Sequence, residues 1–166
     1  MKLPQRRLGL TFVIATICLP SLAGTLDNAP FQIVAPGADW KLDDSVRQEL
    51  AKDVFIVASL INEKKELKSV VISCPVKPSA SALDEVCSGI RESFSNPIVK
   101  KLSDQKTTFL GYKAQALAYE VTQAGQTTYN EARVFIVGNT AWTISFTGSS
   151  SQKDAIKQML TFYRPK

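Results

Sequence analysis

The chain has 166 residues, a hydrophobic fraction of 45% and a formal net charge of +5 at pH 7. This length is that of one domain with a core of ordinary size. Histidine is absent, which excludes the commonest general base, the usual metal ligand and every nucleophile that depends on a histidine partner. An excess of positive charge favours an anionic partner only if that charge belongs to the folded domain.

The first 23 residues have the three parts of a secretory signal peptide. Basic residues open the segment, residues 8–19 are mostly apolar, and small residues precede a cleavage point that we place between Ala23 and Gly24. A membrane anchor is the main alternative, but a span needs about 20 apolar residues and Pro20 ends this run early. Lipid attachment at Cys18 is a second alternative, and it would need small residues where a bulky isoleucine stands.

The predicted signal peptide carries three of the five net positive charges. The mature chain is therefore nearly neutral, and the argument for a nucleic-acid partner disappears. We expect a periplasmic or secreted protein with no membrane span after cleavage. Residues 24–30 are expected to form a flexible mature N-terminus, and residues 31–166 a single domain.

The first half of this domain is predicted to be mostly strands. Residues 31–35 alternate with a period of two and are stopped by Pro36-Gly37. Residues 42–52 fit either a helical turn or a loop. Residues 54–61 and 69–73 are rich in β-branched side chains and flank a charged turn, which indicates a hairpin with a long loop.

A helix is predicted to follow, because apolar residues recur every three or four positions over residues 83–94. Ser81 and Asp84 have the spacing of a capping box at its start, and Asn96-Pro97 marks its end.

The second half of the domain is predicted to be a four-stranded meander and a last helix. The strands are expected at residues 105–110, 112–122, 127–137 and 140–147, with single glycines at 111, 125, 138 and 148 as turn residues. The last helix has Ser151 and Asp154 at capping-box spacing. Its apolar face is formed by Ile156, Met159, Leu160 and Tyr163.

Loss of the signal peptide leaves two cysteines, Cys74 and Cys87. In an oxidising compartment an even pair favours a disulfide. The bridge would close a loop of about 14 residues and stabilise the fold by about 3 kcal/mol in the chain-entropy model. Two buried thiols or a redox-active pair are the alternatives, although the close spacing of a redox motif is absent.

Acidic residues are the only candidates for acid–base catalysis, and they occur as two adjacent pairs. Each pair falls where the first turn of a helix favours negative charge, so capping explains them better than catalysis does. The pairs are Asp43-Asp44 and Asp84-Glu85. A serine nucleophile within residues 149–151 would have only Lys153 as a nearby base. We therefore predict no catalytic, cofactor-binding or metal-binding residues.

Large aromatic residues of the strands have two interpretations. Tyr112, Tyr119 and Tyr129, together with Trp142, could form an exposed binding face. Large rings on strands more often belong to the core.

Several anchor residues together resemble the PsbP-like superfamily, which includes DcrB-like exported bacterial proteins. They are Phe31-x-Ile33-x-x-Pro36-x-x-x-Trp40, Gly111 with the Ala114/Ala116 strand, the run 142–147, and Met159-Leu160-x-Phe162. The resemblance implies an α+β fold, an α/β/α sandwich with a central antiparallel sheet of about six strands. It implies no catalytic residues, because members of this group are mainly binding or assembly-supporting proteins.

These observations predict a noncatalytic exported envelope protein that binds another envelope or secreted protein. One alternative is a module for a small ligand or lipid, held in an apolar cavity between helix 80–95 and the sheet. The other alternative is a hydrolase that uses the carboxylate pairs alone.

Overall fold

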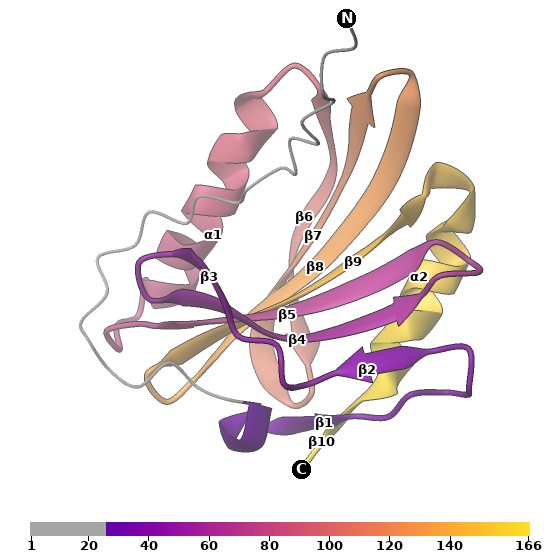
Figure 1. Ribbon diagram of the computed structural model, residues 1–166. Coiled ribbons are helices and arrows are strands. Elements are labelled where there is room, and N and C mark those ends of the chain that lie inside the picture. Colours follow the sequence, from indigo (N-terminus) through magenta and orange to yellow (C-terminus); the bar gives the residue numbers. More distant parts are fainter. Residues whose placement is uncertain (1–25) are drawn as a thin grey trace, which may run out of the picture.

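The computed structural model describes residues 26–166 (Figure 1). The predicted signal peptide and its cleavage between Ala23 and Gly24 lie outside the described residues. Leu26–Asn28 form a 3-10 helix, η1, and Ala29 is buried, where the sequence predicted a flexible segment.

Ten strands and two α-helices follow within residues 26–166. The strands of the first half are β1 (Phe31–Ile33), β2 (Lys41–Asp43), β3 (Gln48–Ala51), β4 (Val54–Asn62) and β5 (Leu67–Pro75). Helix α1 (Ala82–Glu92) and the 3-10 helix η2 (Ser93–Ser95) lead to β6 (Val99–Phe109), β7 (Tyr112–Gln123), β8 (Gln126–Val137) and β9 (Thr140–Ser149). The chain closes with η3 (Ser150–Gln152), α2 (Lys153–Met159), η4 (Leu160–Phe162) and β10 (Tyr163–Pro165).

Eight strands form one antiparallel sheet in the order β2-β4-β5-β9-β8-β7-β6, with β3 also paired to β4. The predicted β4–β5 hairpin and the predicted meander from β6 to β9 are both confirmed. The predicted count of about six strands is too low, because residues 41–51, most of which were expected to be a helical turn or a loop, contain the short strands β2 and β3. Both strands are short and pair along the outer edge of β4.

The two α-helices cover opposite faces of this sheet (Figure 1), which gives the expected α/β/α sandwich. Strand β9 shows how the layers form, because successive side chains of a strand point to opposite faces. Trp142 and Ile144 pack with Met159 of α2 in one buried cluster. The opposite face of the strand carries Ala141, which packs with Val86 of α1 in the other cluster.

The sequence predicted one continuous helix at the C-terminus, and the structure differs from this prediction. Helix α2 ends at Met159, and Tyr163 begins β10, which pairs with β1 in a separate two-stranded sheet. The capping box is formed by Ser149 and Gln152 and not by residues 151 and 154. The 3-10 helix η4 separates α2 from β10. The ring of Tyr163 packs edge-on against that of Phe31, with centroids 5.8 Å apart.

No helix within residues 26–166 is both long enough and apolar enough to cross a membrane.

Candidate functional site

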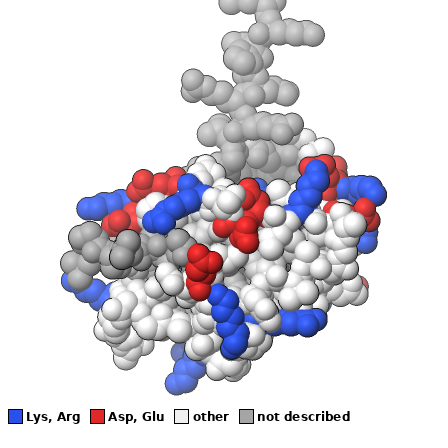
Figure 2. Space-filling model, turned by 60° about the horizontal axis from the view of Figure 1, so that its bottom comes forward, with Lys and Arg blue, Asp and Glu red and all other residues white. Residues whose placement is uncertain are grey.

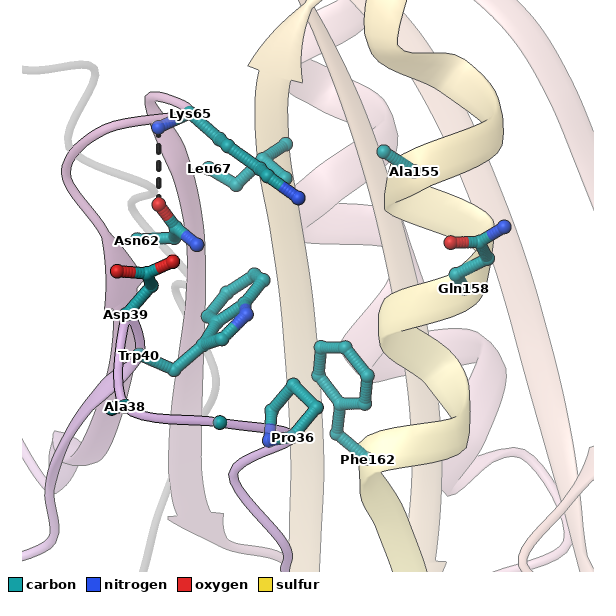
Figure 3. Close-up of a pocket in the computed structure, with 11 residues that line it drawn as sticks. Pro36, Ala38, Asp39, Trp40, Asn62, Lys65, Leu67, Ala155, Gln158 and Phe162 are labelled. Carbon is teal, nitrogen blue, oxygen red and sulfur yellow. Dashed lines mark hydrogen bonds between the residues drawn. The ribbon is translucent and has the colours of Figure 1, made fainter.

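A cavity of about 360 Å³ opens beside α2 (Figure 3). Three segments that are far apart in the sequence line it: the loop 36–40 after β1, the tip of the β4–β5 hairpin, and the residues from Ala155 to Phe162. The loop exists because Pro36 and Gly37 stop β1. The sheet and α2 bring the three segments together, so the cavity is a product of the tertiary fold.

Two aromatic rings form the apolar wall of this pocket. The rings of Trp40 and Phe162 meet edge to face, with centroids 5.2 Å apart and an interplanar angle of 74°. Their backbones are held in place, because Trp40 N donates to Gly37 O at 3.1 Å and Val34 N donates to Phe162 O at 2.8 Å. Both rings are only partly buried, so the wall is fixed and still accessible.

The hairpin supplies the polar wall. Asn62 is only 1% exposed, and its Oδ1 accepts a hydrogen bond from Lys65 N at 3.0 Å. On the other side, Lys65 O accepts from Gln152 Nε2 at 2.6 Å. The backbone of Lys65 is therefore held from both directions, and its side chain extends across the cavity toward α2 (Figure 3).

Ion pairs at the hairpin neutralise most of its charge. Lys64 Nζ lies 2.7 Å from Asp39 Oδ1, and Lys41 Nζ lies 3.0 Å from Glu63 Oε1. On a wider scale, Figure 2 shows acidic and basic side chains interspersed over one face of the molecule, with uncharged surface between them. This face has no large area of a single charge sign.

The acidic residues considered for catalysis have structural contacts. Asp43 Oδ1 accepts hydrogen bonds from Ser45 N and Val46 N, both at 3.1 Å, and this closes the turn after β2. Glu85 Oε1 accepts from Ser81 Oγ at 2.5 Å at the start of α1. These contacts are those of turn and helix-start residues.

The other members of those pairs occupy the surface. Asp44 is exposed, and Asp84 lies 3.8 Å from an Arg91 nitrogen in a surface ion pair. Lys153, the only base near the serine run, lies 2.9 Å from Glu120 Oε1. Among residues 26–166, no three His, Cys, Asp or Glu side chains are grouped closely enough to hold a metal ion.

Cys74 on β5 and Cys87 on α1 are buried in the same hydrophobic cluster. Both are thiols in the structure, so the disulfide stays a prediction. Burial raises the pKa of the Cys87 thiol to about 12. Redox-active cysteines have a lowered pKa instead.

Two of the three tyrosines considered for a binding face are buried, and the third is partly buried. Tyr119 and Tyr129 are 1% and 5% exposed, and Tyr112 is partly buried and stacks on Phe135 at 5.9 Å. Trp142, at 2% exposed, is also in the core. Of the two interpretations given by the sequence, the burial of these rings agrees with core packing, the one that large rings on strands more often have.

The sequence analysis raised an apolar cavity between α1 and the sheet as an alternative, and the α1 side chains that face this space are buried. Val86, Cys87 and Ile90 are at most 1% exposed and pack directly on the strands. The pocket described above lies beside α2. Sequence reasoning identified Trp40 and Phe162 only as structural anchors, and their separation along the chain gave no sign that they meet.

Comparison with known proteins agrees with this fold. No model of a protein family matches the chain, and no curated protein matches it. Among solved structures, the solution structure of cyanobacterial PsbP (CyanoP) from Synechocystis sp. PCC 6803 is similar with a TM-score of 0.61 and 14% identity, over 87% of this chain and 91% of that one. This similarity confirms the PsbP-like fold expected from the anchor residues.

A second structure is more distantly similar. LpqN, described as involved in cell envelope biogenesis of Mycobacterium tuberculosis, has a TM-score of 0.45 and 11% identity, over 85% of this chain and 95% of that one.

Proposed function

We propose that the chain is a noncatalytic exported envelope module that binds a partner protein of the envelope or of the secreted fraction. The binding site in this proposal is the pocket formed by the loop 36–40, the β4–β5 hairpin and α2. The observation that carries the proposal is the accessible aromatic pair Trp40 and Phe162 in a cavity of about 360 Å³.

The physical properties of the pocket support binding. Aromatic residues dominate the energetics of protein interfaces, because a rigid ring offers a large contact area at a low entropic cost. A wall that is already held by hydrogen bonds loses little conformational freedom when a partner docks. The volume of the cavity accommodates one or two apolar side chains of an inserted segment.

Site-specific photocrosslinking in the native host tests this proposal. A photoreactive amino acid at Ala38 or Ala155, which both line the pocket, is expected to form an adduct with the same partner. The matched control carries the probe at Ser88, which is exposed on α1 on the other side of the sheet. We expect no such adduct from Ser88, and we expect Trp40→Ala to abolish the adducts of the pocket positions.

Equal labelling from Ser88, or adducts that survive Trp40→Ala, would place the partner elsewhere. The folding of Trp40→Ala is checked by thermal unfolding.

A small ligand or lipid is the second candidate, and the volume of the pocket beside α2, about 360 Å³, is large enough to hold one. Native mass spectrometry of freshly purified protein would then show added mass, and Trp40→Ala would remove it. A clean apo mass would contradict this candidate.

A further inference from the structure

We infer that the group recognised by the pocket is a carboxylate attached to an apolar body. The inference rests on the proposed function, since it concerns the chemistry of that same site. Such a group occurs at the C-terminus of a polypeptide that ends in an apolar residue, and in a free aliphatic acid.

The first argument is a buried amide without an acceptor. Because Asn62 Oδ1 accepts from Lys65 N, the other end of this amide is its NH₂ group, and Figure 3 shows it directed into the pocket. Asn62 is 1% exposed, and within residues 26–166 no acceptor for the NH₂ group is found. An acceptor atom of a ligand in the pocket can therefore bond to this NH₂ group without displacing a protein partner.

Two more donors face the same space. The indole N–H of Trp40 and the ammonium group of Lys65 both lie at the pocket (Figure 3), and neither has an acceptor among the described residues. The only carboxylate in the lining, that of Asp39, is paired with Lys64 at 2.7 Å. The pocket therefore offers amide, indole and ammonium donors and carries one uncompensated positive charge.

The remaining lining is apolar. Pro36, Leu67 and the rings of Trp40 and Phe162 surround the donors. A ligand that satisfies this arrangement has several acceptor atoms and a negative charge next to apolar surface. A carboxylate on an apolar body meets all of these requirements, because its two oxygens accept several hydrogen bonds and it forms strong charge-assisted ones.

Matched acids and amides test this inference by nuclear magnetic resonance. The probes are acetyl-Ala-Ala-Leu and decanoate, each compared with its uncharged amide. The chain has two tryptophans, so two indole N–H signals are observed, and Trp142 is buried in the core at 2% exposure. An acid is expected to shift the Trp40 signal downfield and to leave the Trp142 signal in place.

Two lysine variants separate a charge in the pocket from general attraction to the hairpin. Lys65→Gln is expected to weaken binding of the acid about two- to fivefold, as for other exposed ion pairs, with no effect on the amide. Lys41→Gln is the control, because Lys41 pairs with Glu63 of the same hairpin at 3.0 Å and neither of these two residues lines the pocket. It is expected to leave binding of the acid unchanged.

The outcomes separate the two proposals. Binding of the peptide acid alone assigns the ligand to a polypeptide C-terminus, and binding of decanoate alone assigns it to a free acid. Acids that bind no better than amides, or equal losses in both lysine variants, overturn the inference. If the pocket still crosslinks a partner in that case, the proposed function stands and only the carboxylate chemistry is rejected.

Discussion

Replacing Phe31 by alanine is expected to lower the free energy of unfolding by about 3 kcal/mol, the lower end of the range for a buried phenylalanine. Phe31 is 0% exposed. Its ring meets those of Trp142, Tyr163 and Phe135 edge-on, with centroids 5.5, 5.8 and 6.1 Å away. Alanine removes all three ring contacts and leaves a cavity at their centre.

The position of Phe31 limits the size of this effect. Strand β1 has three residues, and β10 is its only partner strand in the described part of the chain. If β1 detaches as a unit, the loss cannot exceed the free energy with which this short strand docks. We therefore expect a value near 3 kcal/mol and not near the upper limit of about 5 kcal/mol.

Urea denaturation followed by tryptophan fluorescence measures this loss. Gln32→Ala is the matched control, because Gln32 is the exposed neighbour on the same strand, and its effect is expected to stay within about 0.5 kcal/mol. A loss below about 1 kcal/mol for Phe31→Ala, at an unchanged denaturant slope, would refute the role of this ring in closing the core.

Three further predictions concern other parts of the fold. Gly148→Ala is expected to destabilise the protein by about 1–3 kcal/mol through overpacking, since an added Cβ would lie 2.7 Å from Leu67 Cδ2; an unchanged melting temperature would contradict this contact. Asp104 has a lowered pKa, chiefly because a guanidinium from α1 donates to it. The ionised Asp104 therefore adds to the free energy of unfolding above the unfolded pKa of about 3.9, and this stabilisation is lost as pH falls through the lower folded pKa. Asp104→Asn should cost about 1–3 kcal/mol at pH 7 and much less at pH 2, and a pH-independent cost in urea titrations would reject this account. Finally, a protease that cuts between Cys74 and Cys87 should leave their fragments joined without reductant if the exported protein forms the predicted disulfide. Separate fragments would show two thiols.

Local patterns predicted those parts of the fold whose stabilising contacts are encoded in a short stretch of sequence. Strand β9 alternates between two apolar clusters, and α1 buries residues three and four positions apart. Strands β2 and β3 lack such a pattern, because most of their side chains are exposed. They form only because the edge of β4 is available to them, and that edge is not visible in the segment 42–52.

The sequence left two interpretations of the tyrosines open for a related reason. Alternation along a strand separates the two faces of a sheet, but it does not say which face meets solvent. In this fold helices cover both faces, so residues on either side can be buried. Tyr119 and Tyr129 are on opposite sides of the sheet, next to Phe94 and Glu131 respectively, and both lie in the interior.

The pocket could not be predicted from its residues, because the chain ends complete it. Phe162 is held by Val34 through the hydrogen bond that continues the pairing of β1 with β10. Loosening β1 therefore displaces one of the two aromatic rings without changing any residue that lines the cavity. Phe31→Ala should consequently weaken ligand binding by the folded protein, although Phe31 does not line the pocket. Gly148→Ala differs, because its added Cβ contacts Leu67, which does line the pocket. The affinity is measured without urea, at a temperature where Phe31→Ala is still folded. A loss of affinity under these conditions would show that the pairing of β1 with β10 also fixes the geometry of the pocket.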